Sequence, residues 1–171
     1  MKLLKLISFV FIFFGVLPLT KSVFSESKDS TNYKVLSSSN KSFSIANVEA
    51  YIDEGENFVQ IGDFEKDKDS FKKARNLSKK LAVFYLDINN SFKGKDARIP
   101  NEMKEKGLKI LKIQAKSSER LATIHIREQE PEVAVPLLVE IIRIMSPSSI
   151  EGKKAYENLI KLGFVETPFK G

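Results

Sequence analysis

Few side chains in this sequence could do chemistry, and none of them stands in a catalytic pattern. His125 is the only histidine, and the chain has no cysteine, so thiol nucleophiles, thiolate zinc sites and disulfides are excluded. A histidine base needs a positioned partner, whereas His125 lies in a helical stretch whose spacing favours packing between helices. We therefore predict no catalytic residue.

The carboxylates do not form a convincing metal site either. Asp53, Glu54 and Glu56 are close in sequence, but Asp53 and Glu54 point to different sides of a helix. No loop carries the alternating carboxylates that a calcium site requires. Three further carboxylates stand at a helix start, where negative charge is favourable in itself: Glu128, Glu130 and Glu132. With no phosphate loop and no nucleophile elbow, we expect no enzyme, no metal, no cofactor and no small-molecule substrate.

The first 22 residues have the layout of a secretory signal peptide. Lys2 and Lys5 precede a 14-residue apolar run, Leu6–Leu19, and Thr20 and Ser22 supply small residues for cleavage. The run is shorter than the roughly 20 residues of a membrane-spanning helix. We expect residues 1–22 to be a cleaved signal or an uncleaved N-terminal anchor. Either one places the rest outside the cytoplasm, in a periplasm, a thylakoid lumen or the exterior.

The next segment, 23–45, reads as a flexible linker because serine dominates it and little apolar bulk is present. Charge argues against nucleic acid as a partner. The chain carries a net charge of +6, but Lys2, Lys5 and Lys21 lie in the leader segment, which leaves only +3 for the remainder.

Charge is distributed unevenly beyond the linker. Residues 47–70 hold eight acidic and two basic side chains, whereas residues 71–116 hold thirteen basic and four acidic ones. One interpretation is that neighbouring helices pair along their exposed edges through opposite charges. The other is a bipolar surface that orients a partner.

Hydrophobic periodicity predicts an all-α domain over residues 46–165 with a tail at 166–171, and no stretch reads as a strand. Asn47, Pro100, Pro131 and Ser148 are the predicted starts of four helices. The five expected helices are 47–62, 64–89, 100–127, 131–145 and 148–163.

The first two helices carry a recognisable spacing. Gly55 allows close helix approach, Phe58 fills the space between helices, and Gly62 permits a left-handed turn before Phe71 and Ala74. This spacing resembles a tetratricopeptide (TPR) unit, a helical hairpin that binds other polypeptides. The resemblance implies a fold of TPR-like antiparallel hairpins.

A second unit has the same offsets, with its small residue, Ala122, 67 residues after Gly55, about twice the roughly 34-residue TPR period. The two sets that correspond are Glu54-Gly55, Phe58, Asp67, Phe71 and Ala74, and Leu121-Ala122, His125, Ala134, Leu138 and Ile141. The pattern departs from the family at Asp67, where alanine is usual, and at Glu54, where leucine is usual. The segments 92–100, 135–140 and 163–168 are also similar to small exported TPR-like proteins of cyanobacteria.

In TPR folds the first helix of each unit lines a groove, so the resemblance implies a partner-binding groove. Its residues here would be Glu49, Ile52, Glu56, Val59, Gln60, Lys116, Glu119, Thr123, Ile126 and Arg127. We predict an exported, non-enzymatic adaptor or assembly factor that binds a protein or peptide there. The alternative is a membrane-anchored surface protein whose basic loop touches anionic lipid or an acidic partner. That loop contains Phe92, Lys93, Lys95 and Arg98.

Overall fold

The computed structural model describes residues 42–171, which form five α-helices and no strand. The helices are α2 (Ile45–Ile61), α3 (Phe64–Phe92), α4 (Arg98–Arg127), α5 (Pro131–Met145) and α6 (Ile150–Lys161). The predicted all-α class with five helices is therefore confirmed. The predicted signal or anchor (1–22) and most of the linker (23–45) lie outside the described residues.

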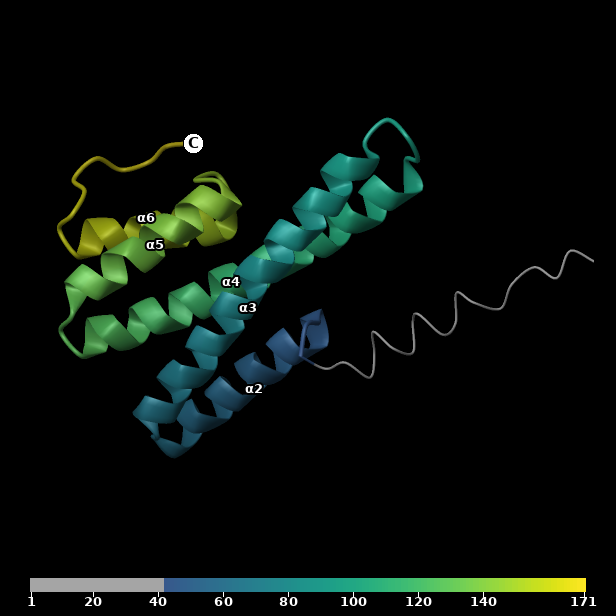
Figure 1. The fold of residues 1–171 in the computed structure, drawn as a ribbon. Helices are drawn as coiled ribbons and strands as arrows, with labels where there is room; N and C mark the ends of the chain where they lie inside the picture. The colour runs from purple at the N-terminus through teal and green to yellow at the C-terminus, as the bar shows by residue number, and fades with distance from the viewer. Residues whose placement is uncertain (1–41) are drawn as a thin grey trace, which may run out of the picture.

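Each helix packs mainly on its neighbours in sequence (Figure 1). The long helices α3 and α4 form an antiparallel hairpin that crosses the molecule. α2 lies along the first half of α3, α5 packs on the second half of α4, and α6 packs on α5. The end of the hairpin that carries the α3–α4 loop extends beyond the other three helices.

The N-cap residues predicted for two helices were wrong, by three positions at α2 and by one at α6. The N-cap of α2 is Ser44, whose Oγ accepts a hydrogen bond from the backbone N–H of Asn47 at 3.2 Å. At α6 the cap is Ser149, which accepts from the Gly152 N–H at 2.9 Å, and not Ser148. In both places a serine offers its oxygen three residues ahead of a free N–H group, the geometry that an N-cap requires.

Prolines and glycines set the other boundaries largely as expected. Pro131 opens α5, whereas α4 begins at Arg98, two residues before the predicted Pro100. Gly62 and Gly163 have φ angles of 76° and 77°, and they end their helices in the left-handed conformation that glycine adopts most easily.

Four of the six corresponding positions of the two units lie in the core. Gly55 is buried against Phe71, and a Cβ atom at residue 55 would be 2.7 Å from the Phe71 ring. This contact explains why the first unit has glycine there. Four corresponding pairs are buried in both units: Gly55 and Ala122, Asp67 and Ala134, Phe71 and Leu138, and Ala74 and Ile141.

Among residues 42–171, no helix combines the length and the apolar character that a membrane crossing needs.

Candidate functional site

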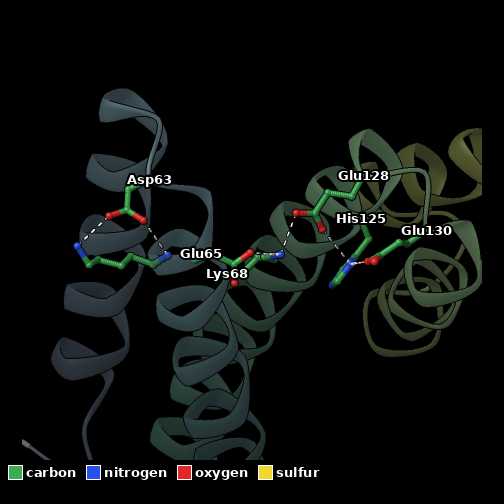
Figure 2. A network of polar contacts seen from close by, with 7 residues as sticks. Asp63, Glu65, Lys68, His125, Glu128 and Glu130 are labelled. Atoms are coloured by element: carbon green, nitrogen blue, oxygen red, sulfur yellow. Dashed lines mark hydrogen bonds and ion pairs between the residues drawn. The ribbon is translucent and has the colours of Figure 1, made fainter.

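A network of charged side chains joins the start of α3 to the end of α4 (Figure 2). The Lys68 ammonium lies 2.8 Å from a Glu128 carboxylate oxygen and 2.9 Å from one of Glu65. The bond to Glu128, followed by the bond to Glu65, raises the pKa of Lys68. The same bond holds the pKa of Glu128 below its ordinary value. Lys68 therefore ties two helices together and stays charged.

His125 continues this network into the α4–α5 turn. Its Nδ1 lies 2.7 Å from Glu130 Oε2 and 3.7 Å from Glu128 Oε2, and the residue is 8% exposed. Among the described residues, His125, Glu128 and Glu130 are the one histidine–carboxylate group compact enough to hold a metal ion. Glu128 is already neutralised by Lys68, and Glu130 already contacts the His125 ring. We therefore assign these side chains a structural role, in which they stabilise the α4–α5 turn. This role agrees with the packing role expected for His125.

A second buried carboxylate connects three helices. Glu140 on α5 is 5% exposed and is contacted by Arg75 and Lys79 of α3 and by Gln114 of α4. The Arg75 Nε lies 2.8 Å and the Lys79 Nζ 3.0 Å from its oxygens. Burial alone would raise the pKa of Glu140, but these cations outweigh it and the pKa is lowered. Glu140 is thus an internal ion-pair centre and is not open to a ligand.

Asp67 is buried in the opposite electrostatic situation. It is 0% exposed, and neither carboxylate oxygen has a hydrogen-bond partner among the described residues. Burial raises the pKa of Asp67 above its ordinary value. The side chain is enclosed, so it offers no surface to a substrate.

The predicted groove between α2 and α4 is occupied by contacts within the chain. Lys109 lies 2.8 Å from Glu49, and Arg120 and Lys116 lie 2.8 and 3.4 Å from Glu56. The acidic edge of α2 and the basic edge of α4 therefore pair with each other here, as one of the two charge interpretations expected.

The other residues expected in that groove are not gathered into one recess. Ile52 is in the core at 4% exposure, and Glu119 forms an ion pair with Lys154 of α6. Thr123 donates a hydrogen bond to the Glu119 carbonyl. Val59 and Ile126 are half-buried against the core, while Gln60 and Arg127 are exposed.

The predicted basic loop lies at the tip of the α3–α4 hairpin. Phe92 is 37% exposed, and Lys93 and Lys95 are exposed without an ion pair among the described residues. Arg98 differs from them, because its guanidinium and backbone N–H both bond to the Asp96 carboxylate, at 2.7 and 3.0 Å.

An open apolar hollow lies beside this tip. A hollow of about 320 Å³ runs between the two helices of the hairpin, and we call it the hairpin groove. Val83, Leu86 and Leu108 are 58%, 57% and 53% exposed on it. From residue 86 to residue 109 no side chain is fully buried. The groove is lined by Ala82, Val83, Tyr85, Leu86, Asn89, Met103, Lys104, Gly107, Leu108 and Leu111.

Sequence reasoning missed the hairpin groove, although a signal for it exists. Residues 81–86 read Leu-Ala-Val-Phe-Tyr-Leu, six apolar residues in a row. Such a run covers every side of a helix, whereas a helix with one buried face needs apolar residues only at steps of three and four. The run therefore indicates that some apolar side chains of this part of α3 point in directions that α2 and α4 together leave uncovered.

A scan against known protein families matches none of them, and searches of curated proteins and of solved structures find no similar chain. The fold and the groove thus define the chain as an all-α protein of antiparallel helices with an open apolar groove.

Proposed function

We propose that this chain is a non-enzymatic adaptor with TPR-like helical hairpins that binds another polypeptide outside the cytoplasm. The observation that carries the proposal is the hairpin groove, where three large aliphatic side chains are each more than half exposed. Covering an aliphatic side chain fully contributes about 1.5–3 kcal/mol, so covering the exposed half of each contributes about 1 kcal/mol. Exposed apolar patches of this kind mark interaction sites on soluble proteins.

The proposed docking face therefore differs from the groove first expected. Ligand binding between α2 and α4 would have to displace the ion pairs of Glu49 and Glu56. The hairpin groove needs no displacement, and its two antiparallel ridges suit a third helix laid between them. The export part of the proposal rests on the signal-like layout of residues 1–22.

The test is capture of a C-terminally tagged chain from its native envelope fraction. The variant Leu108→Asp places a charge in the groove, and Val139→Asp is its control, because Val139 is 49% exposed on α5 and does not line the hairpin groove. We expect a stoichiometric protein partner with the wild type and with Val139→Asp, and its loss with Leu108→Asp. Equal capture by all three would overturn the assignment of the groove. Mass spectrometry of the mature N-terminus in the same sample separates the two hypotheses. A start near Val23 would support a cleaved signal and an exported adaptor, whereas an intact Met1 without a partner would favour the anchored surface protein.

A second candidate function is contact with an anionic membrane surface, and the hairpin tip favours it. The tip combines the exposed ring of Phe92 with the ammonium groups of Lys93 and Lys95, which have no ion-pair partner within residues 42–171. Vesicle flotation with and without phosphatidylserine distinguishes the two functions. Binding that needs the anionic lipid, and that Lys93→Glu with Lys95→Glu abolishes, would support this candidate.

A further inference from the structure

We infer that the occupant of the hairpin groove is an amphipathic α-helix of a partner protein whose apolar face is flanked by carboxylates. This inference rests on the proposed function, since it names the partner that the groove would accept. Its basis is the combination of an apolar floor with three lysines at its edges that have no ion-pair partner among the described residues.

The shape of the groove points to a helix. α3 and α4 run antiparallel on its two sides, and Leu86 and Leu108 stand on opposite walls. The first half of the same hairpin already receives a helix, because α2 packs along α3, contacts α4 and buries Val48 and Ile52. A docked helix would repeat that packing on the part of the hairpin that α2 does not cover.

Charge points to a partner with carboxylates. Lys104 lines the groove, Lys93 follows Asn89 by one helical turn, and Lys112 follows Leu108 by one turn. None of these three lysines forms an ion pair with a described residue. Three carboxylates adjoin groove residues in sequence. Glu102 forms an ion pair with Lys106 at 2.5 Å, and Asp87 and Glu105 directly follow groove residues and so point about 100° away from them.

The same charges disfavour two other occupants. A second copy would bring its own lysines against these lysines, because a two-fold interface places the same patch on both sides. The chain's own segment 1–41 carries six lysines and only two acidic residues, Glu26 and Asp29, so the groove lysines disfavour it as well. The groove lysines attract a partner helix with acidic flanks, whereas they repel a second copy and the segment 1–41.

The experiment uses the full chain as bait against a displayed library of amphipathic helices of about 14 residues, or four turns. The apolar face is varied in Leu, Ile, Val, Phe, Met and Ala, and the flanking positions are varied in Glu, Gln and Lys. The matched baits are the charge-reversed chain, Lys104→Glu with Lys112→Glu, and the groove-blocked chain, Leu108→Asp. Circular dichroism and the midpoint of thermal unfolding verify that each bait is folded.

We expect wild-type bait to enrich helices with Glu flanks, and the best of them to bind at least about 10-fold tighter than the same helix with Gln flanks. The charge-reversed bait should enrich Lys flanks, and the blocked bait should enrich nothing. The preference for Glu should weaken at 1 M salt, where the screening length falls to about 3 Å.

The possible failures are distinguishable. Enrichment without a preference among flanks would overturn the inference and leave the proposed function standing. No enrichment by the folded wild-type bait would overturn both. Self-association of the wild type that Leu108→Asp abolishes, measured by sedimentation, would show that a second copy is the occupant. Flotation with phosphatidylserine vesicles that Leu108→Asp abolishes would show that the groove is a membrane-contacting face.

Discussion

Replacing Asp67 by alanine should stabilise this protein. Asp67 is 0% exposed, and neither of its oxygens has a hydrogen-bond partner among the described residues. Burying a polar group without a partner costs about 1–3 kcal/mol in proteins. Alanine removes that cost and leaves a small gap, which costs about 1 kcal/mol or less. We therefore expect Asp67→Ala to raise the free energy of unfolding at pH 7 by about 1–2 kcal/mol.

The second unit supplies the control. Ala134 occupies the position that corresponds to Asp67 and is also fully buried, which shows that a methyl group suits this place between helices. The reverse substitution, Ala134→Asp, should lower the free energy of unfolding by at least about 1–3 kcal/mol, since it adds volume as well as an unpaired carboxyl. Opposite signs for the two substitutions would tie the effect to the buried carboxyl itself.

The pH dependence gives an independent signature. Burial raises the pKa of Asp67 in the folded protein above its ordinary value of 3.8. As pH rises from about 4, the unfolded chain releases this proton first, so the wild type loses stability until the folded-state pKa is passed. The gain from Asp67→Ala should therefore be smallest below pH 4 and should grow through that window to a plateau.

The assay is urea unfolding followed by far-ultraviolet circular dichroism, because the protein is helical and has no tryptophan. The slope of free energy against urea should be the same for wild type and variant. A loss of more than about 1 kcal/mol in Asp67→Ala, or a gain that does not change with pH, would refute the reasoning. A loss would mean that Asp67 makes a stabilising interaction in the folded protein. A gain that does not change with pH would mean that the pKa of Asp67 is the same in the folded and the unfolded protein.

Three further substitutions test the core and the helix edges. Glu140→Gln should lower the free energy of unfolding by about 2 kcal/mol at pH 7. The pKa of Glu140 in the folded protein is depressed below 4.5. Urea titrations should therefore show this loss vanishing as pH falls through the lowered pKa. Gly55→Ala should cost about 1–3 kcal/mol in the same assay, because a Cβ would lie 2.7 Å from the Phe71 ring, and an unchanged midpoint would show that the ring moves aside freely. Glu56→Gln breaks exposed ion pairs, so it should cost less than about 1 kcal/mol, and that cost should disappear in 1 M salt.

The helices were predictable because their signals are local. Pro131 and the glycines at 62 and 163 mark boundaries through their own backbone preferences, and the apolar stripes supply the rest. Local signals did not, however, fix the start of α2. Ser44 and Asn47 are equally good N-cap residues three positions apart, so residue type could not choose between them.

The role of the charged edges could not be settled from the sequence, because it depends on which helices are neighbours. Glu56 and Arg120 are 64 residues apart, and their ion pair exists only because α2 and α4 lie on the same side of α3. The sequence predicted both an acidic and a basic stretch. Only the packing shows that these stretches meet along the α2–α4 edge, where Glu49, Glu56 and Lys116, first assigned to a partner, form ion pairs within the chain.

The hairpin groove follows from a mismatch in helix length, which no single residue reveals. α2 has 17 residues and α3 has 29, so at 1.5 Å per residue α3 extends about 18 Å beyond what α2 can cover. α5, with 15 residues, likewise covers only half of α4, with 30. In an array of equal helices each apolar face would meet the next unit. Here the added turns keep apolar residues such as Leu86 and Leu108, and no helix within residues 42–171 lies over them, which is why we place the binding function on this part of the fold.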